Sequence, residues 1–64
     1  MSPSWAVNED TGTGLLKLAP GWDRQRAAYQ KVVHQIQAAG YQVSDHDAFH
    51  IHMDECTYYM LKRV

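Results

Sequence analysis

A single helical pattern between Asp23 and Gly40 is the feature that most constrains the fold of this chain. From residue 24 to residue 39 the apolar side chains recur at spacings of three and four, the period of one helix face. They are Tyr29, Val32, Val33, Ile36 and Ala39. Asp23 is placed to cap the N-terminus, and Gly40 to follow the C-terminus in the left-handed conformation, with Tyr41 packing back on Ile36. We therefore expect one helix over residues 24–39.

The segment before this helix has the pattern of a β-hairpin. Two apolar runs, at residues 5–7 and 15–18, flank a dense cluster of turn-forming residues at 8–14. A phosphate-binding loop at Gly12-Thr13-Gly14 would require a helix directly after it, and a strand-like run follows instead. Pro20-Gly21 then ends the second strand.

After Gly40 the sequence alternates as strands do. We expect a short strand at 41–43, a turn at 44–47, and a strand at 48–53 followed by a turn at Asp54-Glu55. Residues 57–64 are rich in aromatic and β-branched side chains, which favours a last strand. A C-terminal helix capped by Asp54 is the alternative for this segment.

Together these elements predict one small α+β domain over residues 1–64. Its architecture is two-layer: a hairpin, a helix, then two or three strands, forming a small antiparallel sheet with one helix packed on one face. A chain of 64 residues with a single cysteine builds a small core and has no intramolecular disulfide to stabilise it. Such a chain is too short to wall a deep active site, so we expect no catalytic residues, no enzyme and no cofactor.

Charge and hydropathy exclude further classes of function. Six basic and seven acidic side chains give a net charge of −1, far from the basic excess that nonspecific nucleic-acid binding requires. No apolar run approaches the roughly 18 residues of a membrane span. The N-terminal segment lacks the basic start and apolar stretch of a signal peptide. We expect a cytoplasmic protein, in the host cytoplasm if a phage encodes it, with no membrane partner.

The aromatic side chains, 11% of the chain, are more than one helix can cover on one sheet face. Tyr58 and Tyr59 are adjacent, so on a strand they point to opposite faces, and one of them lies off the helix-covered face. Exposed aromatic residues beside Met and Arg are typical of interface hot spots. The predicted partner-binding residues are Tyr58, Tyr59, Met60 and Trp5, together with an acidic surface suited to a basic groove, formed by Asp45, Asp47, Asp54 and Glu55.

These observations predict a non-catalytic protein that binds and modulates a larger protein. Accessory or inhibitory proteins of phages and plasmids are commonly of this size, and self-association as a homodimer is a second form of the same prediction. Single-stranded nucleic acid is the first alternative ligand, because aromatic side chains on a sheet can stack bases beside basic residues. The residues that would serve it are Arg24, Arg26, Lys31, Lys62 and Arg63, although the acidic stretch 45–55 opposes a phosphate backbone.

A small zinc site is the second alternative. His50 and His52 lie two residues apart, so on a strand their side chains project to the same side, and Cys56 and His46 would complete a tetrahedral set. The solvated face of an amphipathic strand explains the same histidines without a metal. Cys56 lacks the flanking signature of a nucleophile and fits inert packing.

Overall fold

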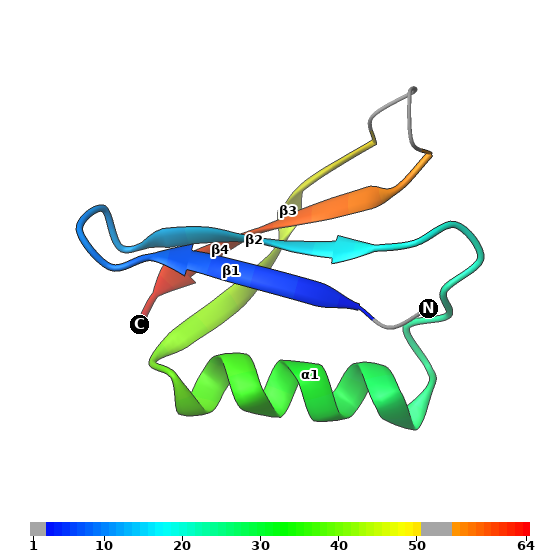
Figure 1. Ribbon diagram of the computed structural model, residues 1–64, viewed down its shortest axis with the longest axis horizontal. Coiled ribbons are helices and arrows are strands. Elements are labelled where there is room, and N and C mark those ends of the chain that lie inside the picture. The colour runs from blue at the N-terminus through cyan, green and yellow to red at the C-terminus, as the bar shows by residue number, and fades with distance from the viewer. Residues whose placement is uncertain (1–2, 51–54) are drawn as a thin grey trace.

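A computed structural model describes residues 3–50 and 55–64, with side chains described over 3–44 and 55–64. The elements of this described part follow one another in the order β1 (Ser4–Asn8), β2 (Thr13–Leu18), α1 (Ala27–Ala38), β3 (Tyr41–His50) and β4 (Thr57–Arg63). The four strands form one antiparallel sheet in the order β1-β2-β4-β3, and α1 lies across one face of it (Figure 1). The predicted two-layer α+β fold with a single helix is confirmed.

The last strand, β4, occupies a central position in the sheet, between β2 and β3. Leu16 of β2 lies opposite Tyr59, and Val43 of β3 lies opposite Leu61. Tyr59 and Leu61 are buried, whereas the intervening Met60 is only partly covered. This alternation between two faces confirms a strand for the C-terminal segment, and the alternative of a helix there is wrong.

The hairpin of β1 and β2 turns through residues 9–12. The side chain of Asn8 accepts a 2.9 Å hydrogen bond from the Asp10 N–H, and its carbonyl accepts one of 2.9 Å from the Gly12 N–H. Gly12 has φ 71°, a left-handed conformation that suits a residue without a Cβ. The hairpin expected from the turn cluster is therefore confirmed, with β2 beginning two residues earlier, at Thr13.

The two ends of α1 differ in how well the sequence predicted them. The helix begins at Ala27, with Arg26 at the N-cap and no side-chain hydrogen bond to the helix. Asp23 is not the cap, because its carboxylate accepts a 2.8 Å hydrogen bond from the Gln25 N–H and shapes the turn before the helix. At the other end Gly40 has φ 92° and donates a 3.0 Å hydrogen bond to the Gln37 carbonyl, as predicted.

The expected turn at residues 44–47 is wrong, since β3 runs without a break from Tyr41 to His50. The polar residues there coincide with an irregularity in the pairing. Ser44 lies opposite Met60, and Phe49 lies opposite Tyr58. Between these two pairs β3 therefore contains more residues than β4. A bulge of this kind absorbs extra residues without ending the strand. The rest of the strand expected at 48–53, residues 51–53, lies outside the described residues.

The core lies between α1 and the sheet. Its buried side chains come from every element except β1; they are Leu16, Leu18, Tyr29, Ile36, Tyr41, Tyr59 and Leu61. Trp5, Val7 and Val43 extend it along the same sheet face, where they are half-buried. Burying one large apolar side chain contributes about 1.5–3 kcal/mol.

Candidate functional site

The sheet face opposite α1, here called the open face, carries an apolar row across three strands. Leu15 lies opposite Ala6 of β1 on one side and Met60 of β4 on the other. Leu15 is 40% exposed, although its neighbour Leu16 is fully buried on the helix side. A shallow hollow of about 550 Å³ lies along this row; its lining residues are Ala6, Val7, Asn8, Thr13, Gly14, Leu15 and Met60.

Two lysines bracket the apolar row on the open face. Lys17 lies opposite Tyr58, with its Nζ 6.0 Å from the centre of the tyrosine ring. Lys62 lies opposite Thr13, beyond Leu15 and Met60. Among the side chains that the structure describes on the strands of this face, none is acidic. The described part of the open face is thus apolar at its centre, with one lysine on each side of the apolar row.

The structure separates the aromatic residues predicted to bind a partner. Tyr58 and Met60 lie on the open face, Tyr58 beside Lys17 and Met60 beside Leu15. Tyr59 belongs to the core and is 8% exposed, and Trp5 is half-buried against the same core. Tyr58 and Met60 are therefore the ones that a partner on the open face would touch.

Sequence reasoning missed Leu15 and Ala6. The signal was present in the pair Leu15-Leu16, because two adjacent large apolar residues on a strand cannot both face the helix. Alternation along a strand, which places Tyr58 and Tyr59 on opposite faces, places Leu15 and Leu16 on opposite faces in the same way. Ala6 follows only from the register, which places it opposite Leu15.

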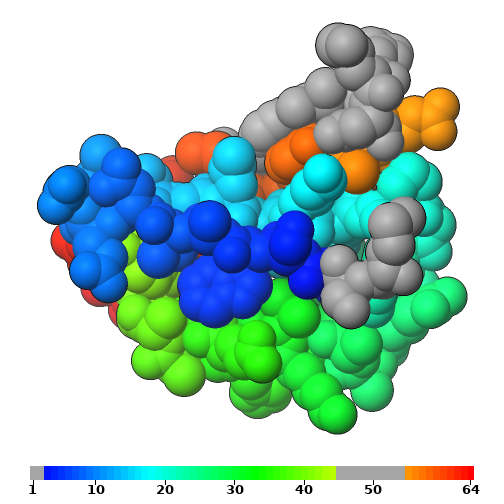
Figure 2. All heavy atoms as spheres, viewed as in Figure 1, coloured from blue at the N-terminus to red at the C-terminus, as the bar shows by residue number. Residues whose placement is uncertain are grey.

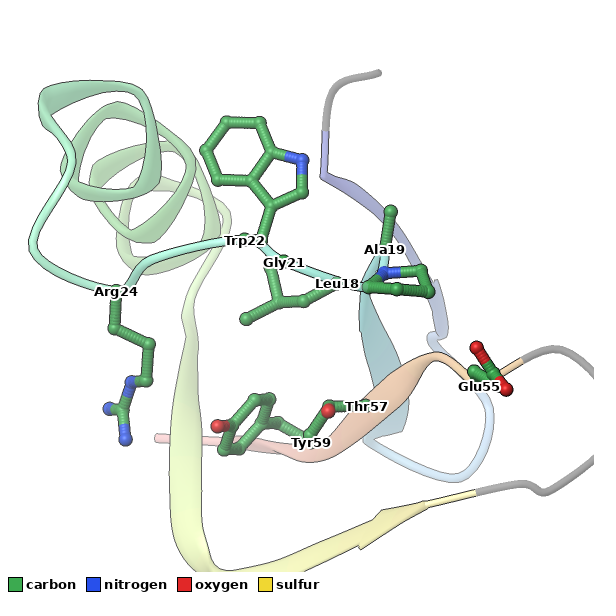
Figure 3. Close-up of a pocket in the computed structure, with 9 residues that line it drawn as sticks. Leu18, Ala19, Gly21, Trp22, Arg24, Glu55, Thr57 and Tyr59 are labelled. Carbon is green, nitrogen blue, oxygen red and sulfur yellow. The ribbon is translucent and has the colours of Figure 1, made fainter.

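The predicted acidic surface falls largely outside what the structure describes. Asp54 lies outside the described residues, as do the side chains of Asp45 and Asp47. Glu55 is exposed, with φ 57°, and lines a second hollow of about 550 Å³ at the end of β2. Figure 3 shows Glu55 and Arg24 on opposite sides of this hollow, with Trp22 and Tyr59 between them.

The basic residues proposed for nucleic acid are spread over the molecule. The Arg24 guanidinium carbon lies 5.0 Å from the Tyr59 ring centre and 5.4 Å from that of Tyr29, and the guanidinium carbon of Arg26 lies 5.4 Å from the Trp22 ring centre. Arg63 is directed at the hairpin turn, where it donates to the carbonyl of Glu9. Lys31 is exposed on α1, and Lys62 is on the open face. These five side chains do not form one continuous strip along the described surface.

The histidine cluster stays a prediction. His52 lies outside the described residues, and so do the side chains of His46 and His50, whose backbones belong to β3. Cys56 is buried. Over the residues that the structure describes, no three His, Cys, Asp or Glu side chains are grouped closely enough to hold a metal ion.

α1 is too short and too polar to cross a membrane, and it is the only helix within residues 3–50 and 55–64. No family model matches the sequence, and comparison with curated proteins and with solved structures found no match.

Proposed function

We propose that this protein is a non-catalytic binding module that docks its open face on an apolar, acid-flanked segment of a larger protein. The observation that carries the proposal is the row of exposed Ala6 and Leu15 and half-buried Met60 between Lys17 and Lys62. In the fold this row lies on the side of the sheet away from α1, which already covers the other face (Figure 1).

The apolar row supplies the binding energy in this proposal. Three paired strands hold the row in place, so little order is lost when a partner binds. Met60 adapts its shape to a partner surface, and Tyr58 beside it has the amphipathic ring typical of hot spots. Leu15, exposed at the middle of the row, is the side chain that a partner would bury most completely.

The lysines determine the kind of partner. Because Lys17 and Lys62 bracket the row, a segment with carboxylates at both ends would place charges of opposite sign beside them. The basic groove predicted to bind Asp45, Asp47, Asp54 and Glu55 is a different kind of partner surface, and most of those acidic side chains lie outside the described residues. We therefore favour a partner with an apolar centre and acidic flanks.

A protein fits the open face better than single-stranded nucleic acid does. Binding of successive bases uses a series of aromatic platforms. The centre of the open face is instead formed by Leu15 and Met60, which are apolar but not aromatic. Covering a surface of the larger protein requires no cofactor, so the effect proposed is steric, as expected of an accessory or inhibitory protein acting in the cytoplasm.

The proposal is tested by quantitative affinity capture with matched variants. Leu15→Asp places a charge at the centre of the row without touching the core, and Gln35→Asp places the same charge on the exposed side of α1. A genuine partner is captured by the wild type and by Gln35→Asp, and its capture falls at least tenfold with Leu15→Asp, as expected for a hot-spot residue. Lys17→Glu combined with Lys62→Glu weakens binding further and reduces its dependence on salt.

Circular dichroism of each variant establishes that the fold is intact. Equal capture by folded Leu15→Asp and by the wild type would contradict the proposal. So would a salt-dependent mobility shift with single-stranded oligonucleotides that Leu15→Asp leaves unchanged and Lys17→Glu abolishes.

A further inference from the structure

The two edges of the sheet are unequally protected. Because the strand order is β1-β2-β4-β3, β1 and β3 are the edge strands. β3 has an irregular register between Ser44 and Phe49, and its sequence there includes two aspartates. Bulges and charges of this kind discourage an edge from pairing with another chain. β1 has neither: its residues Ser4–Asn8 are all uncharged and pair with β2 in unbroken register.

The outward backbone groups of β1 can be identified from the hairpin. The Asn8 carbonyl points into the hairpin, where it accepts the hydrogen bond from Gly12. In an antiparallel pair the N–H and C=O groups alternate in direction from one residue to the next. The groups of Ala6 therefore face β2, and those of Trp5 and Val7 face away from the sheet, toward the edge.

The side chains at this edge are incompletely covered. Trp5 and Val7 point to the helix side of the sheet and are only half-buried. The reason is the position of α1, which contacts β3, at the opposite edge, more than any other strand. Figure 2 shows β1 in blue at the surface of the molecule, bordering the green α1.

We infer that a second copy of this chain pairs with β1, strand to strand and antiparallel, across a two-fold axis at Ala6. In this register Trp5 lies opposite Val7 of the partner subunit, and Ser4 lies opposite Asn8 of the partner subunit. Each outward N–H and C=O of Trp5 and Val7 then meets a group of the other copy. This inference goes beyond the proposed function and does not depend on it.

The register follows from the side chains. Residues directly opposite each other in an antiparallel pair lie on the same face of the sheet. Because side chains alternate between the two faces along a strand, two such residues are an even number of positions apart in the sequence. The two-fold axis therefore passes through a residue and not between two residues. Only an axis at Ala6 pairs every residue of Ser4–Asn8. It also brings the half-buried Trp5 against a β-branched Val7, a favourable cross-strand combination, and leaves a small side chain at the axis.

An axis perpendicular to the sheet keeps both helices on one face. The two open faces then become one continuous surface with two rows of Leu15 and Met60. A strand contact of this length is small for a protein interface, so the dimer is expected to be weak and concentration-dependent.

Cysteine cross-linking tests the register. Ala6 would form a non-hydrogen-bonded pair with its copy, with Cα atoms about 4.5 Å apart, which is within the range of a disulfide. Under mild oxidation Ala6→Cys is expected to form a covalent dimer. Ser4→Cys alone should not, because Ser4 faces Asn8, whereas a mixture of Ser4→Cys and Asn8→Cys should form the mixed dimer. The wild type, whose cysteine is buried, is the control for nonspecific oxidation.

Light scattering over a range of concentrations tests the dimer itself. Ala6→Lys places two like charges opposite each other at the axis and should weaken association at least tenfold, whereas Ser4→Lys should change it little. The inference is overturned if folded Ala6→Cys stays monomeric under oxidation, or if Ser4→Cys cross-links as readily as Ala6→Cys. Loss of partner capture in Leu15→Asp with the dimer intact would show that the two surfaces act separately.

Discussion

The backbone N–H of Arg63, near the end of the chain, donates a 2.8 Å hydrogen bond to the carbonyl of Gly12 in the first turn. The side chain of the same arginine donates to the carbonyl of Glu9, and its guanidinium carbon lies 5.8 Å from the centre of the Tyr41 ring. One residue of β4 therefore connects the hairpin turn to the first residue of β3. Segments that are far apart in sequence are held together at this end of the sheet.

Replacement of Arg63 by Ala should lower the free energy of unfolding by about 1 kcal/mol. The substitution keeps the backbone bond to Gly12 and removes the side-chain hydrogen bond and the packing on Tyr41. Urea denaturation measures the change. Lys31→Ala, on the exposed side of α1, is the control and should stay within about 0.5 kcal/mol. An equal loss in both variants would contradict the connecting role of Arg63.

Gly14 is required by close approach between β1 and β2. A Cβ at this position would lie against the carbonyl oxygen of Ala6 and 2.9 Å from the Val7 Cα, both of which are backbone atoms. Gly14→Ala should therefore destabilise the protein by about 1–3 kcal/mol, the usual cost of overpacking. Thermal unfolding followed by circular dichroism checks this, with Ser4→Ala on the exposed edge as control. An unchanged melting temperature for Gly14→Ala would be evidence against this hairpin geometry.

Gly40, which follows the C-terminus of α1, has a φ of 92°, in the left-handed region. A Cβ there meets no neighbouring atom, so any penalty is one of backbone conformation alone. Gly40→Ala should cost about 1–2 kcal/mol, and Gly40→Asn less, because asparagine tolerates the left-handed region better. Equilibrium unfolding of the two variants gives the order. If Ala and Asn cost the same, the conformational explanation is wrong.

Burial along α1 predicts a gradient in the effects of truncation. Ile36 is fully buried, and Val33 on the same helix is only partly so. Ile36→Ala should cost about 2–5 kcal/mol, near the total stability of a domain this small, whereas Val33→Ala should cost clearly less. Denaturant titration at equal protein concentration compares them, because self-association would raise the apparent stability of both. Similar losses would mean that α1 packs on the sheet in another orientation.

Much of the local structure could be predicted because its signals lie within a few residues. The stripe on α1 from Tyr29 to Ile36, the cap at Gly40 and the turn cluster before β2 are each confirmed, whereas Ala39 is exposed at the C-cap. The N-cap at Asp23 was wrong because its carboxylate serves a turn before the helix instead. The turn expected at 44–47 was wrong because a bulge opposite β4 accommodates the same polar residues.

The candidate site was predictable only in part. Tyr58 and Met60 followed from alternation along one strand, and Tyr58 could be distinguished from Tyr59 only once the helix-covered face was known. Leu15 could be assigned to the same site only from the pairing of β4 with β2, which places Met60 opposite Leu15. The scatter of Arg24, Arg26 and Arg63 likewise became clear only from their contacts with aromatic rings and the hairpin turn.

The sequence by itself determined the kind of each element, since helix period, strand alternation and turn residues act over short stretches of chain, but it did not determine whether residues 41–50 form one strand or two. Only the tertiary structure decided that β4 enters the middle of the sheet and leaves β1 as a regular, uncharged edge. The physical reason is that strand order depends on pairing between distant segments. That pairing is selected by the burial of Leu16, Ile36 and Leu61 together, which no single stretch of sequence contains.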